Sequence, residues 1–123
     1  MLFLCYPKCS TCQKAKKWLT MQEIAFTERH IAEDNPSYEE LKEWYAKSGL
    51  PLKKFFNTSG KLYKDLQLKD KLSAMSEEEQ LQLLSENGML VKRPIVVHND
   101  QVLVGFKEAE WQEHLTAGNT EGN

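Results

Sequence analysis

Residues 2–19 read LFLCYPKCSTCQKAKKWL, and this stretch decides how the chain begins to fold. The apolar run Leu2–Tyr6 stops at a proline and predicts a short buried strand. Apolar residues then recur at helical spacing from Ser10 or Thr11, with lysines largely outside the apolar stripe. Another strand is predicted at Ile24–His30. The chain therefore opens as strand, helix, strand, which favours a parallel pair of strands joined by a helix.

The middle of the sequence predicts helices. Residues 37–49 and 76–88 each begin with a capping box, in which a serine is followed three residues later by a glutamate, and each segment ends at a glycine. Between them, the leucine-rich residues 61–75 predict one helix with a short stub beside it.

The pattern changes near residue 90, where two β-branched runs predict a hairpin. Its strands are expected at Pro94–Val97 and Val102–Val104, about the four-residue turn HNDQ. A short amphipathic helix is predicted at Lys107–Leu115. Residues 116–123 carry no large apolar side chain and are expected to form a disordered tail. We therefore predict one domain over residues 1–115.

The composition narrows the class of protein. The 123 residues include 16 basic and 18 acidic side chains whose charges are interspersed, which argues against a nucleic-acid-binding surface over the whole molecule. No apolar run is long enough to span a membrane, and the first residues turn polar too soon for a signal peptide. We expect a cytoplasmic protein with no membrane partner and no direct nucleic-acid partner.

The pair Cys9 and Cys12 carries the strongest chemical signal. Cys9 is expected in the turn before the first helix, where the helix N-terminus and the neighbouring Lys8 stabilise its thiolate. Cys12, one turn further on, can attack a mixed disulfide formed on Cys9. A zinc site is a weaker interpretation, because the chain has no second closely spaced ligand pair, and we expect no metal. An inert pair is also weaker, since the surrounding turn is polar; Cys5, inside the apolar strand, is instead expected in the core.

A second motif, KRPIVV at residues 92–97, precedes the hairpin. Pro94 stands just before a strand, where a cis bond to Arg93 would turn the chain sharply and bring its backbone beside Cys9. From the residues alone, Arg93 has two interpretations. It is either an anion-binding or thiolate-stabilising group, or a solvated charge at the end of the strand.

Three separated motifs resemble the arsenate reductase (ArsC)/Spx/MgsR family: YPKCSTCQKAKKWL at 6–19, RPIVV at 93–97 and GFKEAEW at 105–111. The resemblance covers residues 1–115 and is greatest to uncharacterised Gram-positive members. It implies an α/β, thioredoxin-like fold with a mixed sheet. It also implies a helical insertion at about residues 35–90, between an N-terminal β-α-β half and a C-terminal β-β-α half, and a cis Pro94 facing the active site.

The resemblance implies roles for the site residues as well. In the arsenate reductases the cysteine at the position of Cys9 attacks arsenate, and several arginines hold the oxyanion. Here Arg93 matches one of these arginines, and the others correspond to Gln13, the region of Asn57 and the region of Phe106. Beside the last of these, Lys107 is expected as a substitute, and Lys8 and Lys107 are expected to assist Arg93 in anion binding.

Two functions follow from the resemblance. The first is a thiol–disulfide oxidoreductase with Cys9 as nucleophile, Cys12 as resolving thiol and Arg93 as stabiliser. Its substrate would be a small thiol, an oxyanion or a protein disulfide. It would use no cofactor beyond a thiol co-substrate such as glutathione, glutaredoxin or thioredoxin. The alternative is an Spx/MgsR-type redox-sensing transcription regulator that binds the RNA polymerase α subunit.

Overall fold

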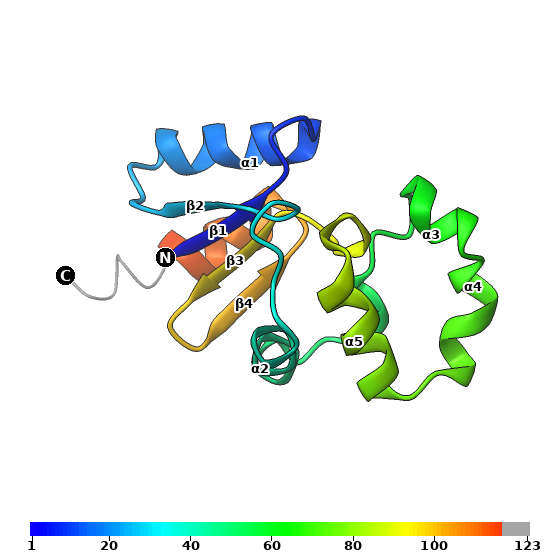
Figure 1. Ribbon diagram of the computed structural model, residues 1–123. Coiled ribbons are helices and arrows are strands. Elements are labelled where there is room, and N and C mark those ends of the chain that lie inside the picture. Colours follow the sequence, from blue (N-terminus) through cyan, green and yellow to red (C-terminus); the bar gives the residue numbers. More distant parts are fainter. Residues whose placement is uncertain (117–123) are drawn as a thin grey trace.

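A mixed four-stranded sheet forms the centre of the computed structural model, which describes residues 1–116 (Figure 1). The strands are β1 (Leu2–Cys5), β2 (Thr27–His30), β3 (Ile95–His98) and β4 (Gln101–Val104). Their order in the sheet is β2-β1-β3-β4. β1 pairs parallel with β2 and antiparallel with β3, and β3 pairs antiparallel with β4. The predicted α/β class, with a parallel opening pair and a late hairpin, is confirmed.

Helices connect and cover the strands. They are α1 (Ser10–Met21), α2 (Tyr38–Ser48), α3 (Lys61–Asp65), α4 (Leu68–Lys71), α5 (Glu77–Glu86) and α6 (Glu108–Trp111). Three short 3-10 segments (Leu52–Phe55, Leu72–Ala74 and Gly88–Leu90) and a π-helical segment (Gln112–Thr116) complete the described chain. No helix among residues 1–116 has the length and apolar character needed to cross a membrane.

The alternation of side chains along the strands divides the core in two. On one face, Phe3, Val96 and Leu103 pack with buried residues of α1 and α6. On the other face, Leu4, Ile95 and Val102 pack with α2 and with the helices between residues 52 and 90. Successive strand residues point to opposite faces, so both faces of this short sheet are buried. α1, which carries Cys12, lies against the first of these faces.

Residues 52–90, here called the helical part, are joined to the sheet by backbone hydrogen bonds near their two ends, here called the base. The backbone N–H of Asn57 donates to the carbonyl of Leu90 at 2.7 Å, and that of Lys92 donates to the carbonyl of Phe55 at 2.7 Å. In Figure 1 the helices α3, α4 and α5 lie to one side of the sheet, joined to it through this base. The chain therefore leaves the helical part and enters β3 directly, which places Arg93 at the start of that strand.

The second strand is shorter than predicted. Residues 24–26 are not part of β2, which begins at Thr27. Glu23 adopts a positive φ of 58°, and the N–H of Ile24 bonds back to the carbonyl of Leu19 at 3.1 Å. Ile24 and Phe26 pack against the α1 side of the core. Their apolar character therefore serves to close the end of α1 rather than to extend the strand.

The hairpin turn is also shorter than predicted. His98 pairs with Gln101, so only Asn99 and Asp100 lie between the strands. Asn99 has a φ of 55°, a conformation that asparagine tolerates better than most residues. This lets the two strands extend by one residue each into the predicted turn HNDQ.

The prediction of one main helix over residues 61–75 was wrong. Gln67 lies in the left-handed region, with φ 55°, and separates α3 from α4. The break redirects the chain so that Leu68 and Leu72 are buried, whereas Leu66 is left 37% exposed. At the other end of the chain, Thr116 belongs to the segment Gln112–Thr116, and the rest of the expected tail, residues 117–123, lies outside the described residues.

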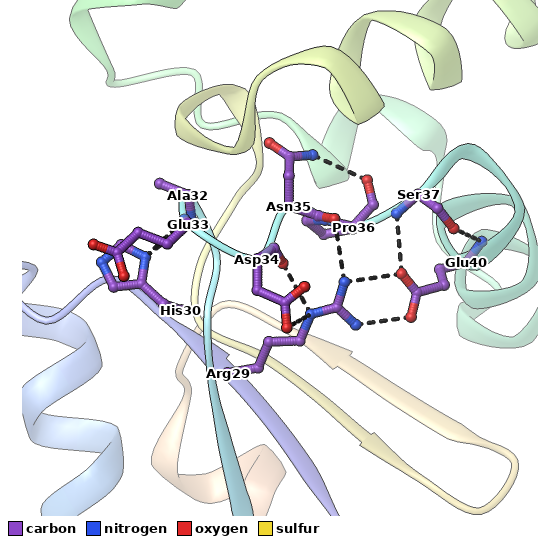
Figure 2. Close-up of polar contacts among 9 residues, drawn as sticks. All are labelled: Arg29, His30, Ala32, Glu33, Asp34, Asn35, Pro36, Ser37 and Glu40. Carbon is purple, nitrogen blue, oxygen red and sulfur yellow. Dashed lines mark hydrogen bonds and ion pairs between the residues drawn. The ribbon is translucent and has the colours of Figure 1, made fainter.

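Both predicted capping boxes are present, and one of them joins a larger network around Arg29 (Figure 2). The guanidinium of Arg29 donates to both carboxylate oxygens of Glu40, at 2.7 and 2.9 Å. It also donates to the backbone carbonyls of Asp34 (2.9 Å) and Asn35 (3.2 Å). These bonds hold the end of β2 against the start of α2.

Asn35 extends this network to α5. Its side-chain amide donates to the carbonyl of Ser85 at 3.0 Å and lies 3.4 Å from that of Leu84. The approach is close because Gly88 lacks a side chain: a Cβ there would lie 2.1 Å from the carbonyl oxygen of Ile31. The network therefore fixes the helical part relative to β2.

The Arg29–Glu40 pair makes a testable contribution to stability. The Arg29 hydrogen bonds hold the pKa of Glu40 at about 2, below its ordinary 4.5. Because the folded pKa is depressed, this contribution is complete above pH 4.5 and is lost as the pH falls toward 2. We expect Arg29→Ala to lower the free energy of unfolding at pH 7 by about 1–3 kcal/mol, limited by solvent screening of the partly exposed carboxylate.

Urea unfolding at pH 7 and pH 3 measures this effect. The variant should lose less stability between the two pH values than the wild type does. Lys47→Ala is the control, since its ion pair with Glu43 is an exposed i,i+4 pair expected to contribute little. An unchanged pH dependence in Arg29→Ala would show that the pair does not act this way.

Candidate functional site

Cys9 is the residue at the N-terminal boundary of α1. Its own backbone is extended (φ −84°, ψ 121°), and its carbonyl accepts the first helical hydrogen bond, from Gln13 N–H at 3.1 Å. Its N–H donates to the carbonyl of Tyr6 at 2.9 Å, which closes the turn between β1 and the helix. The half-buried Cys9 thiol therefore lies at the positive end of a 12-residue helix, where an anion is favoured.

The surroundings lower the pKa of the Cys9 thiol below its ordinary value of 9.0. Burial acts in the opposite direction, but it is outweighed by the backbone N–H and thiol of Cys12, the side chain of Arg93 and the backbone N–H of Thr11. None of the N–H groups forms a full capping hydrogen bond to the sulfur, so they act as nearby dipoles. At neutral pH, Cys9 is consequently the more ionised member of the pair.

Cys12 has the opposite character. It is 2% exposed, and burial raises the pKa of its thiol to about 12, although the backbone N–H of Tyr6 donates to its sulfur at 3.4 Å and acts against this rise. A negative charge on Cys9 raises the pKa of Cys12 further. The two thiols, both reduced in this structure, therefore differ strongly in reactivity although they are three residues apart.

Arg93 is distant in sequence from Cys9 and Cys12, but its side chain lies close enough to Cys9 to affect the pKa of that thiol. Its bond to Pro94 is cis, in agreement with the expectation from the family resemblance. Its guanidinium carbon lies 5.2 Å from the centre of the Tyr6 ring. Two of its nitrogen atoms, Nε and one terminal nitrogen, are buried and have no hydrogen-bond partner among residues 1–116. Of the two interpretations of Arg93, this burial does not fit a solvated charge at the end of the strand.

The remaining predicted anion-binding residues are less closely associated with the pair. Lys8 and Lys107 are exposed, and neither is among the groups that most affect the pKa of Cys9. Gln13 uses its side-chain amide to donate to the carbonyl of Pro7 at 3.0 Å. Asn57 is half-buried, and its backbone is engaged in the base of the helical part. The side chain of Arg93 is thus among the groups that most lower the pKa of Cys9, and those of Lys8 and Lys107 are not.

The third thiol is held in an inactive form. Cys5 is 2% exposed and donates to a Glu28 carboxylate oxygen at 3.2 Å, while the other oxygen of Glu28 lies 2.8 Å from Lys16 Nζ. Burial, followed by the bond to Glu28, raises the pKa of Cys5 to about 12. This agrees with its expected place in the core and separates it chemically from Cys9.

Tyr6 is a site residue that the sequence analysis missed. Tyr6 was predicted only as the last residue of a strand, whereas its ring faces Arg93 and its backbone groups bond to both cysteines. An aromatic residue immediately before the proline of the Cys-x-x-Cys turn was the available signal. Its partner Arg93 is too distant in sequence for any local pattern to reveal the contact.

Other features of the described residues do not compete with this site. Among residues 1–116, no three His, Cys, Asp or Glu side chains gather as a metal site would require. A hollow of about 570 Å³ lies over α2 and α5, lined by Tyr38, Met75, Leu83 and acidic residues of α5, but no cysteine faces it. Cys9 is half-buried at the molecular surface, so a partner reaches it without passing through this hollow.

Comparisons with known proteins agree with this arrangement. A sequence model described as the ArsC family matches residues 4–114. The chain is 57% identical to Uncharacterized protein YusI of Bacillus subtilis, over 93% of this chain and 97% of the relative. It is 34% identical to Regulatory protein MgsR of the same organism, over 89% of this chain and 86% of the relative.

Solved structures show the same likeness. An ArsC family related protein from Bacteroides fragilis has a TM-score of 0.89 and 62% identity, covering 91% of this chain and 94% of the other. An arsenate reductase from Vibrio cholerae has a TM-score of 0.76 and 32% identity, covering 94% of this chain and 97% of the other. The chain is thus similar in fold to a protein titled an arsenate reductase and similar in sequence to one named a regulatory protein.

Proposed function

The chain belongs to the ArsC family, and we propose that within this family it is a thiol–disulfide oxidoreductase that uses Cys9 and Cys12 as its redox pair. The observation that carries the proposal is the opposite perturbation of two adjacent thiols. Cys9 has a lowered pKa at a helix N-terminus, and Cys12 has a raised pKa in the core. A low pKa makes a thiol both available as thiolate and a good leaving group.

The reaction uses each thiol once. The Cys9 thiolate attacks one sulfur of a substrate disulfide, forms a mixed disulfide and releases the other half of the substrate as a thiolate. Cys12 then loses its proton and attacks the Cys9 sulfur, which forms the Cys9–Cys12 disulfide and releases the second half as a thiolate that takes up a proton. The substrate is reduced by two electrons, and an external thiol, such as glutathione, glutaredoxin or thioredoxin, returns the pair to its reduced form.

Arg93 has a supporting role in this proposal. Its positive charge stabilises the thiolate of Cys9, both before the attack and when Cys9 is the leaving group in the final reduction. Its buried, unpaired N–H groups also offer donors to an anionic group of the substrate beside Cys9. Lys8 and Lys107 are proposed to add only long-range positive charge, since both are exposed.

A second candidate function is favoured by the 34% identity to Regulatory protein MgsR. In this alternative, formation of the same disulfide changes the affinity of a surface for a protein partner. We propose the RNA polymerase α subunit as that partner. The chemistry at Cys9 is common to both functions. They differ in whether the pair is turned over repeatedly or changes binding once per oxidation.

One experiment compares both functions. The purified protein is oxidised mildly, its disulfide is mapped by mass spectrometry, and its turnover of a small disulfide is measured with thioredoxin as reductant. In parallel, the reduced and oxidised forms are tested for binding to purified RNA polymerase α subunit. Multiple turnover without binding supports the oxidoreductase, and redox-dependent binding with little turnover supports the regulator. Oxidation that never joins Cys9 to Cys12 contradicts both.

A further inference from the structure

Tyr6 contacts every member of the candidate site. Its carbonyl accepts the N–H of Cys9 at 2.9 Å, and its own N–H donates to the sulfur of Cys12 at 3.4 Å. Its ring, in contrast, takes no part in these backbone bonds and faces the guanidinium of Arg93 at 5.2 Å. The side chain of Tyr6 therefore has a function separate from that of its backbone.

The ring contacts the guanidinium of Arg93, whose side chain also interacts with the Cys9 thiol. Arg93 forms no ion pair with a carboxylate in residues 1–116, and its Nε and one terminal nitrogen have no hydrogen bond there. Arg29 provides a contrast within the same protein, because its N–H groups are occupied by Glu40 and by backbone carbonyls. A guanidinium held in that way has few N–H groups left for a ligand.

An aromatic face holds a guanidinium differently from a carboxylate. The attraction arises from the negative face of the ring, so it orients the cation without occupying its N–H groups and without cancelling its charge. The charge and donors of Arg93 thus stay available for a thiolate or a substrate anion. This is the property that a group beside a reactive cysteine requires.

The Tyr6 ring is itself held in place. It meets the ring of His30 edge-on, with the centres 5.6 Å apart and the planes at 86°. His30 in turn accepts the backbone N–H groups of Ala32 (3.2 Å) and Glu33 (3.0 Å) on Nδ1, which fixes its orientation in the turn after β2 (Figure 2). The Tyr6 hydroxyl has no hydrogen bond to a described residue, so the ring face is its active part.

We propose that Tyr6 is a positioning residue of the redox site, whose ring holds the Arg93 guanidinium beside the Cys9 sulfur while leaving Nε and one terminal nitrogen unpaired. The inference rests on the proposed function, in which Cys9 is the nucleophile and Arg93 its stabiliser. Tyr6 acts through Arg93 and touches neither the substrate nor the reacting sulfur with its side chain.

The test measures the pH dependence of Cys9 alkylation by iodoacetamide, with the modified residue identified by mass spectrometry. Arg93→Ala should raise the Cys9 pKa by about 1–3, the usual effect of losing a nearby opposite charge, and Tyr6→Leu by about 1. Tyr6→Phe should leave it unchanged, because the ring face is kept. In the Arg93→Ala background, Tyr6→Leu should cause no further change, because the two residues act as one unit.

Two further variants exclude a purely structural effect. Tyr45→Leu removes another half-buried tyrosine ring, which belongs to α2 and packs on Phe55, and should not change the Cys9 pKa. Replacing Tyr6 with pentafluorophenylalanine keeps a ring of similar size but reverses the charge of its face, and should raise the Cys9 pKa as Tyr6→Leu does. This variant keeps the test decisive if Tyr6→Leu does not fold.

The possible outcomes distinguish failure of the positioning role of Tyr6 from failure of the proposed oxidoreductase function. If Arg93→Ala raises the Cys9 pKa but neither Tyr6→Leu nor the fluorinated ring does, the positioning role is wrong and the proposed function stands. If additive effects appear in the double variant, Tyr6 acts on Cys9 independently of Arg93, and the inference is again wrong. If Arg93→Ala leaves the Cys9 pKa unchanged, Arg93 does not stabilise the Cys9 thiolate, and both its role in the proposed function and the positioning role of Tyr6 are wrong.

Discussion

Cys9→Ser is expected to remove the fast-reacting thiol of the protein, whereas Cys12→Ser is expected to retain it. With a pKa of about 12, Cys12 is ionised at pH 7 to a fraction of roughly 10⁻⁵, while Cys9, whose pKa lies below 9.0, exceeds roughly 10⁻². The higher intrinsic nucleophilicity of a more basic thiolate recovers only part of this difference. The alkylation rate at pH 7 should therefore fall by about 30-fold or more in Cys9→Ser.

The two variants should also differ in the disulfides that they form. Cys12→Ser lacks the resolving thiol, so a small disulfide should leave a stable mixed disulfide on Cys9, which mass spectrometry detects as a fixed mass increase. Cys9→Ser should form neither this adduct nor an intramolecular disulfide. Cys5→Ala is the matched control: it removes a buried thiol that is bonded to Glu28, and should change neither alkylation nor disulfide formation. A fast thiol that survives in Cys9→Ser would falsify the assignment.

Arsenate is expected to be a poor substrate, because the chain should bind it weakly. The family resemblance implies an anion site with several arginines, whereas Arg93 is the one arginine that matches those positions and Gln13 bonds to the carbonyl of Pro7. Each missing charged donor costs on the order of 1.5–3 kcal/mol, so two missing arginines should weaken arsenate capture by ~10²–10⁴-fold. A small disulfide needs no such site and should be reduced readily.

Glutaredoxin-coupled arsenate turnover, compared with small-disulfide turnover in the same preparation, measures this difference. The double variant Gln13→Arg, Asn57→Arg should bind arsenate more tightly than the wild type, because it returns two guanidinium groups to positions that the resemblance marks. A matched variant with methionine at both positions supplies length without charge and should not. Robust arsenate turnover by the wild-type protein would overturn this prediction.

Several parts of the fold and site were predictable because they depend on neighbours in sequence. Each capping box is a pair of hydrogen bonds between residues three apart, and the boxes at Ser37 and Ser76 formed as predicted. The placement of Cys9 at the start of α1 follows from a proline, a polar turn and a helical repeat within one short stretch. The hairpin of β3 and β4 follows from two β-branched runs and a turn.

Where local patterns misled, a single residue in a left-handed conformation was involved. Gln67 divides the helix predicted over 61–75, and Glu23 ends α1 in a way that takes Ile24 out of the predicted strand. Neither residue is a glycine, so neither carries the usual sequence signal for a positive φ. The conformations are stable because the residues that follow, such as Leu68 and Ile24, gain burial in the core.

The sequence by itself determined that Cys9 lies at a helix N-terminus with Cys12 three residues further on, since both are local properties. Only the tertiary structure decided how Arg93 meets these thiols. Its guanidinium lies over the ring of Tyr6, near the opposite end of the sequence, and its Nε and one terminal nitrogen have no hydrogen-bond partner among residues 1–116. Pairing β1 with β3 brings these two residues together, and no repeat or motif near either one encodes that contact.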